Sequence, residues 1–371
     1  MSRSVALSQS EEGMSPKAGP PERYLALDAA RGFVMVVLCT GGLGLGLLDG
    51  SPTLQRVAAQ FRHLRWDGFV PWELIMPAFM FMVGTSLPFA LARRREQGQT
   101  CSQMFRHAGC RVLALIVLGQ VLWSLYAGRY HFDPIETLTQ LGLSYWVAFL
   151  VLQLEFRWQI VAAAFLTALN WALFVIFPGP GGSFSPTANV GLRIDRAVFG
   201  LDHTYDWSSI NFIGSTVTVL FGAWTGSLLK DKTKLPSDKV KILTAAVVTS
   251  FVLTFVLLPV NPIIHKCWTA SFTVCHTGFV LLMILLFFWL FDVKRYHKLA
   301  YPFVVVGMNS IFIYLINQSL KSPWLDQSVG VFTQRFKFLG VLGPVAQAWA
   351  VFFVMWYICY WLYQRKIFFK V

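Results

Sequence analysis

Hydrophobic residues along this chain form runs of nearly twenty positions, separated by short polar or charged segments. A helix needs about 20 apolar residues to cross the hydrocarbon core of a bilayer, so each run predicts a transmembrane helix. We predict ten such helices, at about residues 24–48, 71–91, 112–127, 137–154, 158–177, 210–229, 242–260, 268–291, 299–320 and 345–363. The predicted fold class is therefore an all-α polytopic membrane protein, with about ten helices in one bundle.

Local features refine this outline. Residues 1–23 are polar and lack the apolar stretch of a signal peptide, so we predict a disordered cytoplasmic tail, followed by one transmembrane domain over 24–371. Pro77 falls within the second helix and predicts a kink there. The run Gly41–Gly46 lacks the strand and the lysine of a phosphate loop, so it indicates close helix packing or an unwound helix end instead.

Composition agrees with a membrane protein whose partner is the lipid bilayer. Of the 371 residues, 56% are hydrophobic and 13% are charged, whereas soluble domains carry about 25% charged residues. The net charge of +13 does not indicate nucleic-acid binding, because basic residues in membrane proteins collect in cytoplasmic loops. Here Lys and Arg favour the side of the termini by about two to one, so we predict cytoplasmic termini. The six cysteines form no CxxC pair, and a homodimer is left open.

Groups capable of chemistry gather where a polar segment runs directly into the second helix. Such groups at the mouth of a membrane span are functional candidates by default. His63 can serve as a general base near neutral pH, and Asp67 would orient its imidazole if the segment is helical. The alternative is a histidine that is merely hydrogen-bonded at the membrane interface, beside Trp66 as an interfacial aromatic residue.

Other polar residues have two interpretations each. Asp28 and Arg31 share a helix face, either as a plain ion pair or as part of a donor site. Asn309 is an amide within a predicted span and must bond to another helix or to a ligand. Arg196 and Lys266 are contacts for an anionic group, or plain interface charges.

A metal site is not predicted. The charge bias puts His63, His131, His203 and His265 on the far side from the termini, but their spacings are long. No HxH or HExxH pair, which would present two ligands on one element, occurs among them.

Five stretches match motifs of one known family. The pattern H-x-x-W-[ND]-G, an acid, then P-x-F-x-F-x-x-G matches at His63, Trp66, Asp67, Gly68, Glu73, Pro77, Phe79, Phe81 and Gly84. The others are an LD-x-x-RG opening at Leu27–Gly32, a YIDR…G…Y-DPEG loop at residues 193–206, a P-x-x-K-x-x-W-[ST]-x-S segment at residues 262–271 and a GMNSI string at Gly307–Ile311. On these motifs the chain resembles the heparan-alpha-glucosaminide N-acetyltransferase family and its bacterial members, from Leu27 to Val371.

The resemblance implies an integral membrane acyltransferase of a bacterial inner (plasma) membrane. It would pass an acetyl group from cytoplasmic acetyl-CoA, a co-substrate rather than a resident cofactor, to an amino sugar or other glycan acceptor on the opposite face. The donor and acceptor would then meet through a polar channel in the bundle. The implied residues are catalytic His63 and Asp67, donor-binding Asp28, Arg31 and Asn309, and acceptor-binding Trp66, Arg196, Asp206, Lys266 and Trp268.

The chain also departs from the family pattern. Gln140 stands in the place of an arginine, Trp207 begins a segment that replaces PEG, and the region of Gly42 lacks an asparagine. His265 takes the usual lysine position. The competing hypothesis is a transporter or a lipid- or glycan-handling protein without covalent chemistry. Transporters often have two similar halves, and no motif repeats between the halves here, which favours the enzyme.

Overall fold

The computed structural model describes residues 24–130 and 132–369, and within these ranges it is helical with no strand, which confirms the all-α fold class. The predicted tail at 1–23 and His131 lie outside the described residues. The α-helices are α1 Leu25–Cys39, α2 Pro52–Ala59, α3 Ile75–Glu96, α4 Cys101–Ala127, α5 Thr137–Val151, α6 Phe156–Ile176, α7 Val190–Phe199, α8 Phe212–Lys230, α9 Pro236–Leu257, α10 Ala270–Phe287, α11 His297–Gly307, α12 Ser310–Ser319, α13 Asp326–Thr333 and α14 Gly343–Gln364.

Seven helical segments of the described chain are long and apolar enough to cross a membrane. An eighth is added if α11 and α12, which are bent by 57° at their junction, form one span. The predicted number of ten is not confirmed, because α1 and α5 have only 15 residues each, fewer than the roughly 20 that a bilayer requires.

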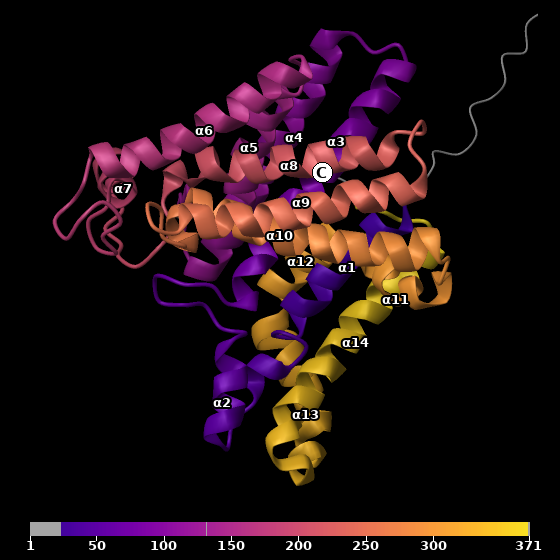
Figure 1. Ribbon diagram of the computed structural model, residues 1–371. Helices are drawn as coiled ribbons and strands as arrows, with labels where there is room; N and C mark the ends of the chain where they lie inside the picture. Colours follow the sequence, from indigo (N-terminus) through magenta and orange to yellow (C-terminus); the bar gives the residue numbers. More distant parts are fainter. Residues whose placement is uncertain (1–23, 131, 370–371) are drawn as a thin grey trace, which may run out of the picture.

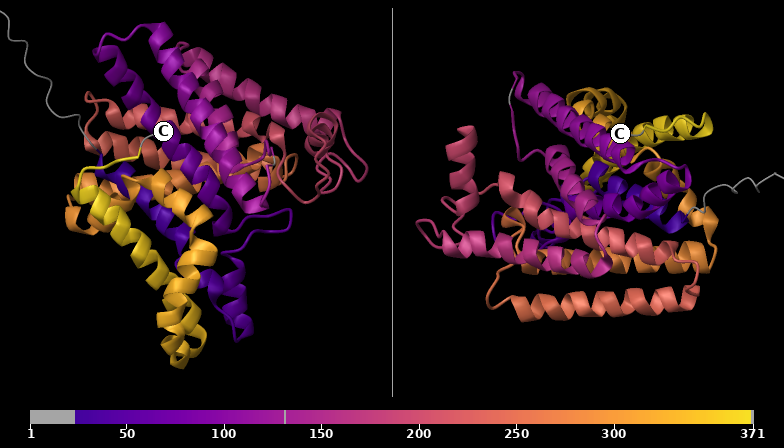
Figure 2. Two further views of the ribbon diagram at one scale, coloured as in Figure 1. Left: turned by 180° about the vertical axis from the view of Figure 1, so that it is seen from behind. Right: turned by 90° about the horizontal axis from the view of Figure 1, so that it is seen from above.

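The outer helices present apolar side chains outward. In Figure 1, α8, α9 and α10 run side by side, and α7 with its long loops lies beyond their left end. The view from above in Figure 2 shows α9 as the outermost layer on one side. Val252 and Phe255 of α9 and Phe165 of α6 are all more than half exposed. Exposed apolar surface on this scale is typical of contact with lipid.

Glycines let central helices meet backbone to backbone. A Cβ atom on Gly84 of α3 would lie 2.1 Å from the carbonyl oxygen of Val219 on α8. A Cβ atom on Gly32 of α1 would lie 1.8 Å from the carbonyl oxygen of Phe303 on α11, and Gly307 makes the reciprocal contact. Small residues of this kind permit the close approach on which membrane helix packing depends.

Of the two backbone irregularities predicted from the sequence, one is an unwound helix end and the other is a kink at Pro77. α1 ends at Cys39, and the run Gly41–Gly46 that follows contains positive φ angles, so the interpretation as an unwound helix end is confirmed. Pro77 lies in the first turn of α3 rather than in its interior. A proline there leaves no helical hydrogen bond unmade, because first-turn N–H groups have no partner within the helix.

Three central helices begin at the same end of the bundle, each after a 3₁₀ turn. The turns are Pro71–Leu74 before α3, Ser209–Asn211 before α8 and His265–Cys267 before α10. These three helices contact one another, and a helix N-terminus carries the positive end of the helix dipole. We call the segments that lead into them, residues 61–74, 178–211 and 258–269, the loop layer.

Candidate functional site

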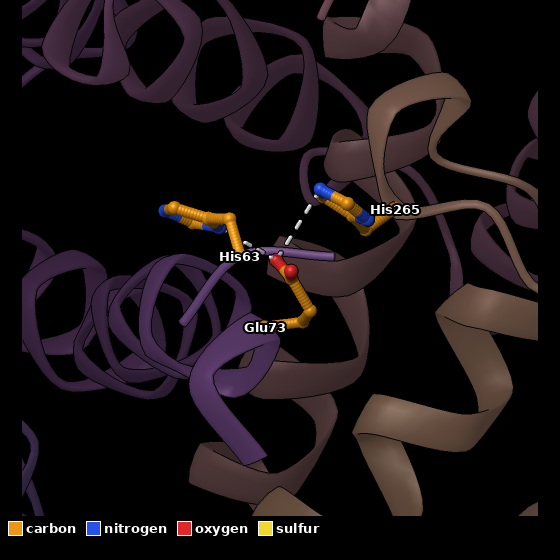
Figure 3. A group of neighbouring side chains, drawn as sticks. All are labelled: His63, Glu73 and His265. Atoms are coloured by element: carbon orange, nitrogen blue, oxygen red, sulfur yellow. Dashed lines mark hydrogen bonds and ion pairs between the residues drawn. The ribbon is translucent and has the colours of Figure 1, made fainter. Parts of the chain in front are cut away.

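A buried carboxylate in the loop layer lies between two imidazoles. Figure 3 shows the Glu73 carboxylate pointing toward His63 and His265, and we call these three residues the Glu73 cluster. Glu73 Oε2 is 3.0 Å from His63 Nδ1 and 3.4 Å from His265 Nε2. The side chains of Glu73 and His265 are each 2% exposed, whereas that of His63 is 51% exposed. The cluster therefore has a buried half and a half that is open to solvent.

Local structure holds the carboxylate in this orientation. Glu73 belongs to the 3₁₀ turn that begins at Pro71, a residue whose fixed φ angle suits the start of a helical turn. Its second oxygen, Oε1, accepts a hydrogen bond of 2.9 Å from the backbone N–H of Leu64. One oxygen thus anchors the neighbouring backbone of His63, while the other faces both imidazoles.

His265 is almost fully buried, and neither of its ring nitrogens has a hydrogen-bond partner among the described residues. The ring nitrogens of His203 also lack such a partner, but the His203 side chain is 16% exposed. His265 Nε2 faces Glu73 without hydrogen-bond geometry, and His265 Nδ1 has no partner either. Burial lowers the pKa of His265 to about 4, although the nearby Glu73 carboxylate acts in the opposite direction. The imidazole is consequently neutral near pH 7, with a lone pair in the buried half of the cluster.

Trp207 packs against both imidazoles. The centroid of its ring lies 5.4 Å from that of His63 and 5.4 Å from that of His265, edge-on in each case. Lys266 Nζ lies 5.5 Å from the centre of the Trp207 ring and donates to the carbonyl of Tyr205. The departures from the family pattern at His265 and Trp207 therefore lie in contact with each other and with His63.

The predicted role of Asp67 required a helical segment, and this condition is not met. Residues 63–70 are irregular, and Asp67 is exposed. The carboxylate bonded to His63 belongs to Glu73, which the motif contained but to which the sequence analysis gave no role. The sequence does contain a signal that was not used: Glu73 is an acid at the very start of an apolar span, where an unpaired charge is costly.

The two predicted tryptophans use their indole N–H groups within the protein. Trp66 Nε1 donates to the carbonyl of Phe184 at 3.0 Å and joins two segments of the loop layer. Trp268 is 1% exposed, and its Nε1 donates to Thr218 Oγ1 at 3.2 Å. Trp268 is therefore a packing residue between α8 and the start of α10.

A second cluster of histidine and carboxylate groups, the Asp195 cluster, consists of Asp195, His203, Asp206 and the backbone of Ser209. Asp195 is 0% exposed, and its two oxygens accept from the Ser209 N–H at 3.2 and 3.0 Å. His203 Nε2 lies 3.3 Å from Asp195, and His203 Nδ1 lies 3.8 Å from Asp206. The Asp195 carboxylate is the main cause that raises the pKa of His203, which its burial opposes.

Gln140 and Arg196 make polar contacts at the edges of the loop layer. Gln140 is 1% exposed, and its Nε2 donates to the carbonyls of Pro134 and Ser209 at 2.8 and 3.0 Å. Arg196 is exposed and pairs with Asp202. Gln140 therefore supports the start of α8, a role that requires an amide N–H and no positive charge.

The predicted donor residues lie away from the Glu73 cluster. The predicted ion pair is confirmed, since Arg31 donates to Asp28 at 2.7 Å and also to Ser86 Oγ at 3.1 Å. At the start of α1 the backbone N–H groups of Leu25 and Ala26 bond to a carboxylate that follows α10. This is the end of the bundle opposite to the loop layer, because α10 begins in that layer.

Asn309 lies fully buried at the break between α11 and α12. Its Nδ2 donates to the carbonyl of Ile367 at 3.2 Å, and its Oδ1 accepts from the N–H of Phe369 at 3.0 Å. The partner that a buried amide requires is therefore the C-terminal segment of the chain itself.

Comparison with known proteins supports the distant relationship that the motifs predict. The chain is 24% identical to the heparan-alpha-glucosaminide N-acetyltransferase of Mus musculus over 94% of its own length, and 22% identical to that of Homo sapiens over 95%. It spans 60% of the length of each of these relatives. No protein-family model matches the chain.

Proposed function

We propose that this integral membrane protein transfers an acetyl group from acetyl-CoA to an amino sugar or another glycan acceptor. The observation that carries the proposal is the half-exposed His63 imidazole held by the buried Glu73. An ionised carboxylate only accepts, so His63 Nδ1 donates and Nε2 keeps a lone pair. A positioned lone pair of this kind can act as the general base of the transfer.

The reaction follows from this arrangement. The acceptor amine or hydroxyl attacks the thioester carbonyl, a bond forms from its nitrogen or oxygen to the acetyl carbon, and the carbon–sulfur bond breaks. His63 takes the proton from the acceptor and returns it to the departing thiolate. The N-termini of α3, α8 and α10 would favour the negative charge on the carbonyl oxygen in the transition state. Transfer through an acetylated His63 would use the same lone pair.

A basic cavity supports binding of the donor from the opposite face. It has a volume of about 390 Å³, and Lys232, Lys234 and Lys239 line it beside Asp292. These residues belong to the α8–α9 connection, the first turns of α9 and the π-helical turn after α10, far from the loop layer along the helices. The phosphates of acetyl-CoA are anionic and would be attracted there. Asp28 lies nearby on α1, and a polar passage would carry the thioester toward His63.

The first test compares two histidines of the loop layer. His63→Ala should abolish acetyl transfer to glucosamine while the variant remains folded, because the His63 side chain is half exposed and leaves little cavity. His203→Ala is the matched control and should retain activity. Activity and thermal midpoint should be measured on the same detergent-purified samples. Full activity in His63→Ala would eliminate His63 as the catalytic base.

The second test concerns the side of the membrane. The bias of basic residues predicts cytoplasmic termini, and so places Cys101 in the cytoplasm and the loop layer outside. A membrane-impermeant thiol reagent should therefore not modify Cys101 in intact cells, and sealed vesicles should consume acetyl-CoA from the cytoplasmic face only. Labelling of Cys101 from outside would reverse the proposed direction.

A transporter is the second candidate, and the bend of 57° between α11 and α12 favours it, since broken helices are typical of transporters. However, the amide at the break, Asn309, bonds to Ile367 and Phe369 of the chain's own C-terminal segment. Passage of a labelled sugar across sealed vesicles without consumption of acetyl-CoA would favour the transporter over the enzyme.

A further inference from the structure

The Glu73 cluster has the dimensions of a metal site. One ligand atom from each of His63, Glu73 and His265 lies within 4.8 Å of the other two. Zinc binds nitrogen and oxygen ligands at about 2.0–2.2 Å, which puts neighbouring ligands of a tetrahedral site roughly 3.3 Å apart. The distances of 3.0 and 3.4 Å from Glu73 to the two imidazoles agree with that separation.

The buried half of the cluster also lacks a bonding partner, and a cation could be that partner. Both ring nitrogens of His265 are without a hydrogen bond in the described chain, although the side chain is only 2% exposed. Buried polar groups are satisfied in the great majority of cases, and each exception needs an explanation. Glu73 is equally buried and brings a negative charge beside this ring. A positive ion between His265 Nε2 and the Glu73 carboxylate would give that nitrogen a partner and balance the negative charge.

We propose that His63, Glu73 and His265 bind a divalent transition-metal ion of the zinc type through three ligands. Two imidazoles and one carboxylate form a donor set that zinc uses in catalytic sites, with the fourth position open to water or substrate. Calcium and magnesium prefer sets made of oxygen atoms. The His63 side chain is 51% exposed, so water or an acceptor could reach the cluster from its side.

Neighbouring contacts hold the ligands in place before an ion binds. The bond from the Leu64 N–H fixes Glu73 Oε1 and leaves Oε2 for the metal. Trp207 packs against the edges of both imidazoles and limits the rotation of their rings. Such outer contacts set ligand orientation, and their loss typically reduces metal affinity about 10–100-fold. The spacing of the histidines along the sequence had argued against a metal site, but these ligands come from two separate loops.

The site goes beyond the proposed function, and one consequence rests on that function. With an ion bound, His63 Nδ1 would be a ligand and Nε2 would carry the ring proton, so the ion would take the place of the His63 base. An acceptor amine or hydroxyl at the open position would release its proton to solvent more readily, as metal-bound water does. This gives His265 a role in acetyl transfer, whereas a His63–Glu73 base pair alone needs no second imidazole. Metal binding itself requires neither acetyl-CoA nor an acceptor.

The test is a zinc titration of the full-length chain, purified in detergent and stripped with a chelator. After zinc is added back and the sample is desalted, about one zinc ion per chain should remain bound. Cobalt added instead should give the visible spectrum of a tetrahedral site. His265→Gln and Glu73→Gln should each weaken zinc binding by at least about tenfold. His203→Gln, in the Asp195 cluster, is the control and should bind zinc as the unaltered protein does.

Two results would overturn the site: no retained zinc in the unaltered protein, or unchanged zinc affinity in His265→Gln. Thermal midpoints of all variants show whether a loss of binding follows a loss of folding, and His63→Gln, on the exposed side, provides a second variant in the event that His265→Gln does not fold. Acetyl transfer is measured separately, with and without chelator. Zinc binding without transfer would contradict only the proposed function, and transfer without zinc binding would contradict only the metal site.

Discussion

The Glu73 and Asp195 clusters both pair a buried carboxylate with histidine in the same loop layer, yet they use the carboxylate differently. In the Asp195 cluster, both oxygens accept from the Ser209 N–H, and His203 lies beside them. In the Glu73 cluster, one oxygen accepts from the backbone and the other faces two imidazoles. The first arrangement joins α7 to the start of α8, and the second leaves a carboxylate oxygen and two imidazoles that can bind a ligand.

The difference shows how to distinguish structural from functional polar groups in this protein. A carboxylate whose hydrogen bonds all go to the backbone of its own loop holds that loop closed, as Asp195 does. His265 is 2% exposed with neither ring nitrogen hydrogen-bonded, which costs folding free energy without a structural return. His203 also lacks hydrogen bonds at both ring nitrogens, but its 16% exposure makes that cost smaller. A cost such as that at His265 is typical of sites that bind a ligand or carry out chemistry.

The largest expected contrast is in activity. Glu73→Gln should reduce acetyl transfer by about 10²–10⁴-fold, the usual contribution of general acid–base catalysis, because an amide cannot hold the His63 tautomer in the same way. Asp195→Asn should reduce it by less than about tenfold, since Asp195 lies outside the Glu73 cluster. Rates at saturating acetyl-CoA would show this. Equal losses in the two variants would mean that the clusters act as one unit.

The next contrast concerns stability, where Asp195→Asn should have the larger effect and Glu73→Gln the smaller one. Asp195→Asn should lower the free energy of unfolding by about 1–3 kcal/mol, because both oxygens lie within 3.2 Å of the one Ser209 N–H and the new NH₂ group would face that donor in either orientation. Glu73→Gln should cost less, because Gln keeps an oxygen for the Leu64 N–H. Unfolding midpoints in detergent would rank the two. A greater loss for Glu73→Gln would contradict the division of roles.

A smaller effect is expected at Trp207. Trp207→Leu removes aromatic contacts worth about 0.5–1.5 kcal/mol each from His63 and His265, and so loosens the positions of their rings. The turnover number should fall by at most about tenfold, which corresponds to 1.4 kcal/mol. Trp66→Leu, which breaks a bond between loops instead, is the comparison variant. Steady-state kinetics that show no change in Trp207→Leu would remove this residue from the site.

The smallest effect is the pH dependence of stability. Because Asp195 raises the pKa of His203 above its unfolded value, the stabilisation is fully present below pH about 6.5 and is lost as pH rises through the raised folded value. The thermal midpoint of the unaltered protein should therefore exceed that of His203→Gln most at low pH. The two melting curves should converge in alkaline buffer. A gap that widens with pH would have the wrong sign.

Much of the fold could be predicted because the signals are local. Runs of apolar residues marked each membrane helix, and the spacing of Asp28 and Arg31 by three positions placed them on one face, where they pair. The number of long spans could not be predicted in the same way. The first apolar run continues past Cys39, but positive φ angles at Gly41 and Gly42 end the helix there. Hydrophobicity carries no information about φ angles, so the sequence pattern overestimated the length of α1.

Some features of the site follow from the sequence alone, and others follow only from the tertiary structure. The sequence alone determined that His63 stands at the mouth of a membrane helix within a recognisable motif, because that information lies in adjacent residues. Only the tertiary structure decided that Glu73 holds it and that His265 completes the cluster, since 3₁₀ turns at the starts of α3 and α10 bring them together. The nearest carboxylate in the sequence, Asp67, is exposed in an irregular loop. Contacts across loops depend on the packing of α3 against α10, and no local spacing encodes that packing.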